Sequence, residues 1–139
     1  MQTFKQFITE DLAGYRARTI RNNIITIDGI KTYQGTAKLW GCNLTKLPDL
    51  SDIRVTGDFE CFTNDLTTLE GSPQSIGGNY NAYNNPLKSL KGVSEFIGGT
   101  FYSDQFSDAD YRKYIEAQKL KQDLDPESND LFGGMIDTI

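Results

Sequence analysis

Hydrophobic and small residues recur with a fixed period through the middle of the chain. Three stretches align at a period of 21 residues: VTGDFECFTNDLTTLEGSPQS from Val55, IGGNYNAYNNPLKSLKGVSEF from Ile76 and IGGTFYSDQF from Ile97. A further copy, TAKLWGCNLTKLPDL, lies upstream at a spacing of 22 residues. The pattern predicts a solenoid of about three full coils and one truncated coil. The matching positions are Ala37, Leu39, Cys42, Leu44 and Leu47 in the upstream copy, and then Gly57, Gly78 and Gly99; Phe59, Tyr80 and Phe101; Cys61, Ala82 and Ser103; Asn64 and Asn85; Leu66 and Leu87; Leu69 and Leu90; Gly71 and Gly92.

Such coils must stack to be stable, because a single coil cannot bury its own apolar arm. We expect the repeated asparagine to bond the backbone of the turn that leaves each strand. The glycine before each aromatic residue suits a tight bend into the strand, where a Cβ would be costly. Side chains such as Phe59 and Cys61 then point into a shared core.

The pattern resembles the leucine-rich repeat, L-x-x-L-x-L-x-x-(N/C)-x-L, which has one short strand per unit. The resemblance covers residues 34–106, about half of the chain, and is closest to a short glycine-rich variant associated with bacteriophage and bacterial proteins. It implies an α+β solenoid of short parallel β coils over residues 23–106. The residues that carry it are Phe59, Cys61, Asn64 and Leu66 in one coil and Tyr80, Ala82, Asn85 and Leu87 in the next.

Both ends of the solenoid need capping helices, because exposed strand edges invite aggregation. Residues 1–22 predict an N-terminal helix, followed by the strand-like NIITIDG. Residues 107–139 predict a C-terminal cap, in which Ser107 and Asp110 resemble a capping box that opens a helix of about fourteen residues. The tail LFGGMIDTI is expected to lie on this cap, and residues 1–139 then form a single domain. The apolar sides of the two helices are Phe4, Phe7, Ile8, Leu12 and Tyr15, and Tyr111, Tyr114, Ile115 and Leu120.

The outward face of the strands is where we expect function. Side chains alternate along a strand, so residues between the inward positions point outward. The third outward column places aromatic residues in three consecutive coils, with neighbours about 4.8 Å apart. The repeats that this chain resembles usually carry a small polar residue there. The three columns are Thr36, Asp58, Asn79 and Thr100; Lys38, Glu60, Asn81 and Tyr102; and Trp40, Phe62, Tyr83 and Asp104.

An exposed aromatic patch commonly marks an interface, with tryptophan and tyrosine as preferred anchors. The acidic residues Asp58, Glu60 and Asp104 favour a partner with basic groups at its rim. Three alternatives stay open. The rings stack on themselves or lie under a terminal segment, a second copy of the chain pairs with this face as a dimer, or the rings stack on a glycan beside Asn79, Asn81 and Asn84. The predicted partner-binding residues are Lys38, Trp40, Glu60, Phe62, Asn81, Tyr83 and Tyr102.

Composition narrows the function classes. The 139 residues carry a formal net charge of -5 and no histidine. The acidic balance argues against nucleic acid as a partner, and the missing histidine removes the commonest general base and metal ligand. Asp104, Asp108 and Asp110 match no calcium loop, and Asp58 and Glu60 lie too close for a glycosidase pair. We therefore expect no enzyme, no catalytic residue, no cofactor and no metal.

The two cysteines and the lengths of the apolar runs indicate where in the cell the protein is expected. Cys42 and Cys61 are too few for a disulfide framework and occupy repeat positions that suit a small apolar side chain, so buried reduced thiols are predicted. No run approaches the roughly 18 apolar residues of a membrane span, and the N-terminus lacks the pattern of a secretion signal. We expect an intracellular protein with no membrane partner.

The N-terminal sequence carries a second signal. MQTFKQFITE followed by Asp11 resembles the capsid-targeting peptide of the internal head proteins of T-even-like phages, which begins Met-Lys-Thr and ends Ile-x-Glu. Ile8 and Glu10 match the site cut by the prohead protease, which would cleave before Asp11, whereas Gln2 replaces the usual lysine. The alternative is that Phe4, Phe7 and Ile8 cover the first coil, in which case cleavage would remove that cover.

Together, the resemblances imply a phage-encoded protein-binding module that binds and blocks a host protein, such as a defence or restriction factor. The targeting peptide implies packaging in the capsid, contact with the capsid or prohead protease, and delivery with the genome. The expected locations are the host cell cytoplasm during infection and the interior of the virion head. A structural internal head protein and a glycan-binding module are the alternatives.

Overall fold

A computed structural model describes residues 4–124 of the chain, with side chains from residue 12 onward. The chain divides into two compact units, Met1–Asp108 and Ala109–Ile139. Helix α1 (Phe4–Asn22) and all the strands of the described part lie in the first unit, and helix α2 (Asp108–Leu124) provides the described part of the second. The tail LFGGMIDTI lies outside the described residues.

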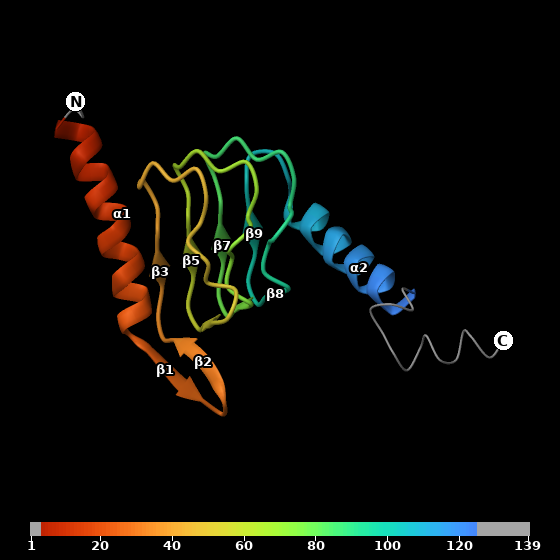
Figure 1. Cartoon of the computed structure of the whole chain (residues 1–139). Coiled ribbons are helices and arrows are strands. Elements are labelled where there is room, and N and C mark those ends of the chain that lie inside the picture. Colours follow the sequence, from red (N-terminus) through yellow and green to blue (C-terminus); the bar gives the residue numbers. More distant parts are fainter. Residues whose placement is uncertain (1–3, 125–139) are drawn as a thin grey trace. The chain divides into compact units, whose positions relative to one another are not determined.

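Each repeat contributes short strands to two sheets (Figure 1). The four-stranded sheet has the order β3-β5-β7-β9, with parallel neighbours throughout. The five-stranded sheet has the order β1-β2-β4-β6-β8, in which β1 and β2 form an antiparallel hairpin and the other pairs are parallel. The strands are β1 (Ile24–Ile27), β2 (Ile30–Tyr33), β3 (Ala37–Lys38), β4 (Arg54–Val55), β5 (Phe59–Glu60), β6 (Ser75–Ile76), β7 (Tyr80–Asn81), β8 (Phe96–Ile97) and β9 (Phe101–Tyr102).

The fold is a β-solenoid of about three parallel turns with an N-terminal and a C-terminal helix, which confirms the predicted fold class. The expectation of one strand per repeat is incomplete, because each later repeat supplies a strand to both sheets. The additional strands β4, β6 and β8 are each two residues long. A strand this short cannot show an alternating pattern in the sequence.

The aligned aromatic residues form the centre of the core. Phe59, Tyr80 and Phe101 are at most 1% exposed, and their ring centroids lie 4.9 Å and 5.4 Å apart along the stack. The register pairs Phe59 with Tyr80 and Tyr80 with Phe101, which confirms the sequence alignment of the coils. The Tyr80 hydroxyl shares a 2.6 Å hydrogen bond with Ser72 Oγ, so the polar end of this buried ring is satisfied inside the core.

Buried asparagines tie neighbouring coils together. Asn64 Oδ1 accepts hydrogen bonds from the backbone N–H groups of Cys42 (3.0 Å) and Leu44 (2.9 Å). Its Nδ2 donates to the carbonyl oxygens of Leu39 and Cys61, both at 2.9 Å. The predicted bond to the turn that leaves the strand is therefore present, and the same side chain also holds the preceding coil.

Asn85 repeats this arrangement one coil later. Its Oδ1 accepts from the Leu66 N–H at 3.1 Å, and its Nδ2 donates to the carbonyl oxygens of Cys61 (3.0 Å) and Ala82 (3.2 Å). The Cys61 carbonyl thus receives one bond from its own coil and one from the next.

Two repeated glycines allow neighbouring coils to approach closely. A Cβ on Gly78 would collide with Asp58 Oδ1, and a Cβ on Gly99 would collide with Asn79 Oδ1. The expected cost of a Cβ is confirmed, but neither glycine has a positive φ. The cause is the neighbouring coil's side chain, not a backbone conformation that only glycine adopts.

Helix α1 runs beside β3 (Figure 1). Two of its arginines donate hydrogen bonds to the first coil. Arg16 Nη1 donates to the Trp40 carbonyl oxygen at 2.6 Å, and Arg21 Nη2 donates to the Asp49 carbonyl oxygen. Ile20 is buried at 2% exposure. The prediction that Tyr15 belongs to the covered side of this helix is wrong, because Tyr15 is 61% exposed and the contact passes through the side of the helix that bears Ile20.

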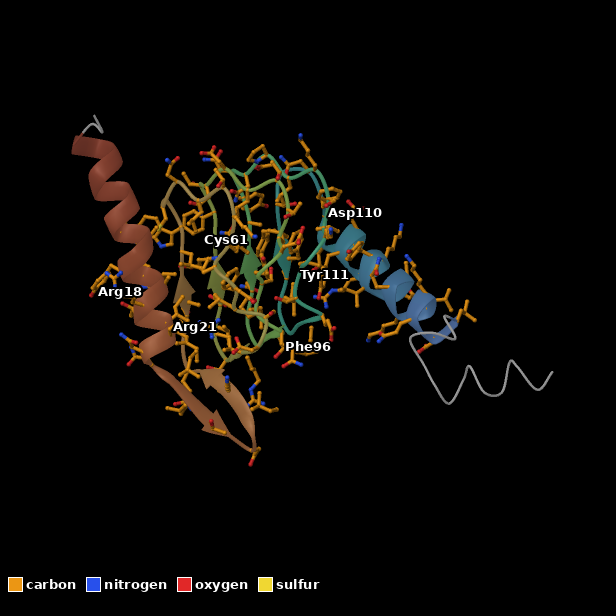
Figure 2. All side chains as sticks on the ribbon, in the orientation of Figure 1. Arg18, Arg21, Cys61, Phe96, Asp110 and Tyr111 are labelled. Carbon is orange, nitrogen blue, oxygen red and sulfur yellow. The ribbon has the colours of Figure 1, made fainter. Side chains whose placement is uncertain are left out.

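An ion pair anchors the C-terminal end of α1, where Figure 2 labels Arg21. Arg21 Nη1 lies 3.0 Å from Asp52 Oδ1, and Lys31 Nζ lies 3.4 Å from Asp52 Oδ2. Partial desolvation acts against ionisation of Asp52, but the hydrogen bond and charge of Arg21, together with Lys31, lower the pKa of this carboxyl below its ordinary value. The pair is exposed and therefore positions the helix more than it stabilises it.

Helix α2 confirms the predicted C-terminal helix and begins directly after Ser107. It has 17 residues, where about fourteen were predicted. Tyr111, labelled in Figure 2, is buried, with the Arg112 guanidinium 5.1 Å from its ring centroid. The placement of Leu120 on a covered face is wrong, because Leu120 is exposed, whereas Tyr111 near the start of the helix is buried.

The asparagine bonds give a stability prediction. We expect Asn64→Ala to lower the free energy of unfolding by about 3 kcal/mol or more, since it removes the side-chain partners of the Cys42 and Leu44 N–H groups and of the Leu39 carbonyl. Urea denaturation followed by circular dichroism measures the change. The control is Gln74→Ala, which removes an exposed amide of the same solenoid and should cost less than about 0.5 kcal/mol. A loss below about 1 kcal/mol for Asn64→Ala would contradict the role assigned to Asn64.

Candidate functional site

The candidate site is the outward face of the four-stranded sheet, called here the strand face and defined by the outward residues of β3, β5, β7 and β9 and of the segments that flank them. The register pairs Lys38 with Glu60, Glu60 with Asn81 and Asn81 with Tyr102. The second predicted column is therefore present as a continuous row across the sheet.

Side chains of the first predicted column form hydrogen bonds to the backbone of the next coil. Asp58 Oδ1 accepts a hydrogen bond from the Asn79 N–H at 2.8 Å, and Asn79 Oδ1 accepts one from the Thr100 N–H at 2.9 Å. Thr36 Oγ1 accepts a longer bond, 3.4 Å, from the Asp58 N–H. These side chains bind the next coil, so Asp58 is less available to a partner than the sequence suggests.

The aromatic residues form two separate pairs. Trp40 and Phe62 stack with centroids 5.6 Å apart and planes within 4°, whereas Tyr83 lies 5.6 Å from Tyr102 at an angle of 31°. The structure describes no ring contact between Phe62 and Tyr83. The continuous ladder predicted for the third column is thus wrong. In the fourth coil the third column holds Asp104, which has no ring. Tyr83 instead pairs with Tyr102, which belongs to the second column.

The two aromatic pairs differ in how much a partner could reach. The Arg16 guanidinium lies 4.2 Å from the centroid of the Trp40 ring and so covers part of the first pair. Trp40 keeps 37% exposure, while Tyr83 and Tyr102 keep 43% and 36%. Self-stacking and cover by a terminal segment therefore both occur at Trp40, yet each of these three rings retains accessible surface.

Two charged side chains beside the rings, Lys38 and Glu60, have no partner among the described residues. Lys38 and Glu60 are register neighbours of opposite charge, but the described part of the chain shows no ion pair between them and no side-chain hydrogen bond to either. Asn81 Oδ1 accepts from the Tyr83 N–H at 3.0 Å, and Asp104 Oδ2 accepts from the Asn84 N–H at 2.6 Å. Of the charges on this face, Lys38 and Glu60 are thus the ones without a bonded side chain in the described part of the protein.

Both cysteines are free and buried, as predicted. Figure 2 shows Cys61 inside the coils. Desolvation by burial raises the pKa of the Cys61 thiol to about 12, although a hydrogen bond with Tyr80 acts in the opposite direction. Burial also raises the pKa of Cys42, against the charge of Arg16, whose Nη1 lies 3.9 Å from the Cys42 sulfur. Neither thiol has the lowered pKa of a reactive nucleophile.

The remaining predicted sites have different outcomes. The cleavage residues Ile8, Glu10 and Asp11 fall within α1 in the stretch whose side chains lie outside the described ones. Within the described residues, no cluster of three or more metal-ligating side chains occurs. Neither helix, over its described length, is both long and apolar enough to cross a membrane.

Sequence reasoning did not identify Arg16 or Arg21 as important. Their contacts to Trp40 and Asp49 join segments 24 and 28 residues apart. The signal in the sequence was a group of three arginines, Arg16, Arg18 and Arg21, near the end of α1, which a search for apolar periodicity ignores.

Comparison of the chain with protein-family models, with curated proteins and with solved structures finds no match.

The buried thiol makes stability depend on pH. With a folded pKa of about 12 against an ordinary value of 9.0, the Cys61 thiol contributes stability that is complete below pH 9 and is lost as pH rises from 9 to 12. Between pH 8 and pH 11 we expect the native protein to lose about 2–3 kcal/mol more than Cys61→Ala, because each pKa unit is worth about 1.4 kcal/mol. Urea denaturation at both pH values measures this difference.

Alanine is a conservative replacement because Ala82 occupies the equivalent position in the next coil. Lysine and tyrosine titrations are common to both proteins and cancel in the comparison. Equal losses in the two proteins would show that the Cys61 thiol is not responsible.

Proposed function

We propose that this protein is a binding module that holds a protein partner on its strand face. The observation that carries the proposal is a group of accessible rings, Trp40, Tyr83 and Tyr102, beside the unpaired charges of Lys38 and Glu60. Aromatic anchors surrounded by charges that set orientation are typical of protein interfaces. Phe62 and Asn81 complete the surface.

The hydrogen bonds that the asparagines of this face already make favour a protein partner over a glycan. Glycan recognition would need amide groups free to bond sugar hydroxyls. Asn79 and Asn81 each commit their side-chain oxygen to a backbone N–H of this chain, and Asn84 Nδ2 lies 3.3 Å from Thr63 Oγ1. Each of these amides therefore has part of its hydrogen-bonding capacity committed within the solenoid, which leaves less of it for a sugar.

The proposal extends to a biological setting through the N-terminal sequence. The resemblance of residues 1–11 to a capsid-targeting peptide supports a phage protein that is packaged in the head and delivered with the genome. In that setting the partner is a host protein, such as a defence factor, which the strand face occludes. The same peptide would also serve a structural head protein, whose partner would be the capsid.

The strand face is tested with Tyr83→Ala and Tyr102→Ala combined. These rings contact each other rather than α1, so the double variant should remain folded while partner capture falls at least tenfold. Quantitative affinity capture from a lysate of host cells measures retention of each protein by the immobilised module. The matched control is Phe96→Ala, which removes an exposed ring from the five-stranded sheet (Figure 2).

Loss of the same captured protein in both variants would indicate non-specific adhesion. Unchanged capture by the double variant would show that the strand face does not bind the partner. Sedimentation velocity over a range of concentrations separates a third outcome, in which the double variant abolishes only self-association.

Packaging is tested by intact mass spectrometry of the protein recovered from purified particles of the phage that encodes it. We expect a species that begins at Asp11. Full-length protein in infected cells, together with its absence from particles, would contradict packaging and leave an intracellular binding protein.

A further inference from the structure

A groove of about 260 Å³ lies between α1 and the first coil, inside the Met1–Asp108 unit. It is distinct from the aromatic pairs of the strand face, although Lys38 contributes to both surfaces. Its walls come from one side of the helix and from the start of the four-stranded sheet. The lining residues are Tyr15, Arg16, Thr19, Ile20, Tyr33, Thr36 and Lys38.

The groove is positively charged in a protein of net charge -5. Arg16 and Lys38 both line it, and among the side chains that the structure describes no carboxylate does. Neither cation takes part in an ion pair within the described residues. The neighbouring acid Asp52 is already paired with Arg21 and Lys31.

Arg16 is held in a fixed position at this groove. One guanidinium nitrogen donates to the Trp40 carbonyl, and the group lies over the Trp40 ring. A guanidinium carries further N–H donors in a planar fork that matches the two oxygens of a carboxylate or phosphate. Because Arg16 is already positioned, a ligand would lose little of its binding free energy to ordering that side chain.

Residues with hydroxyl groups line the groove together with the two cations. The hydroxyls of Tyr15 and Tyr33 have no hydrogen-bond partner in the described part of the chain, and Thr36 Oγ1 accepts a bond from the Asp58 N–H, which leaves its own hydrogen available. Thr19 differs, because its hydroxyl donates to the Tyr15 carbonyl at 2.9 Å. The groove thus offers two cations and several O–H donors to a single small volume.

We propose that this groove binds an oxyanion, either a carboxylate or a phosphate group, between Arg16 and Lys38. The volume suits a small organic anion or one acidic side chain, with the Tyr15 and Tyr33 rings beside its uncharged part. The inference goes beyond the proposed partner surface and does not depend on it. The anion has two sources with the same chemistry: a free small molecule, or an acidic side chain of a protein.

The test is titration of the ¹⁵N-labelled full chain at constant ionic strength, followed by amide chemical shifts. The probes are inorganic phosphate, phenyl phosphate, acetylglutamate amide and, as the neutral control, benzyl alcohol. We expect saturable shifts at residues 15–20 and 33–38 with the anions and none with the alcohol. Preference for phenyl phosphate indicates a free anion, and preference for acetylglutamate amide indicates an acidic side chain.

Matched variants locate the binding. Lys38→Met should weaken anion binding at least fivefold, and Tyr15→Phe should weaken it by a smaller factor while preserving the ring. Lys46→Met removes the same charge from an exposed position of the first coil that does not line the groove, and should leave the affinity unchanged.

Non-saturable shifts, or equal weakening by Lys38→Met and Lys46→Met, would overturn the proposal. Tyr83 and Tyr102 do not line the groove. Their combined replacement therefore leaves anion binding intact, which separates failure of the groove from failure of the strand face.

Discussion

Hydrogen bonds between the backbone of one coil and the next coil keep the coils in register. Strands of two residues provide few of these bonds, and the buried asparagines Asn64 and Asn85 provide additional ones. Asn64 alone joins four backbone groups of two coils. A slip of one residue would leave these groups buried without partners and would turn the inward aromatics outward. The aromatic core, the side-chain ladder of the strand face and the outward rings all depend on this register.

The same dependence on backbone pairing explains the charges at the ends of the four-stranded sheet. At the first coil the Trp40 carbonyl has no preceding coil to pair with, and Arg16 donates to it. At the last coil the Phe101 N–H has no following coil, and Asp108 Oδ1 accepts from it at 2.9 Å. A cation suits an unpaired carbonyl and a carboxylate suits an unpaired N–H, so both edge groups are already hydrogen-bonded and are not available for edge-to-edge pairing.

Periodicity was enough to predict the solenoid, the coil alignment and the inward residues, because a repeated position sees the same environment in every coil. It could not predict features that break the repeat. Tyr83 pairs with Tyr102 because the fourth coil has Asp104, not an aromatic residue, in the third column. Thr63 adopts φ 58° where Gly41 and Asn84 stand in neighbouring coils, a conformation that a β-branched residue rarely adopts. Contacts of α1 depend on distant segments that no local pattern connects.

Capping and recognition meet at the first coil. Arg16 satisfies the edge carbonyl and lies over the Trp40 ring, so the aromatic residue beside α1 is held in place by the chain itself. The same guanidinium places positive charge in the groove, next to the unpaired Lys38. The strand face therefore has a basic end at the first coil, while Glu60 and Asp104 make its remainder acidic. A partner that follows this gradient would have one preferred orientation, which an aromatic surface alone would not impose.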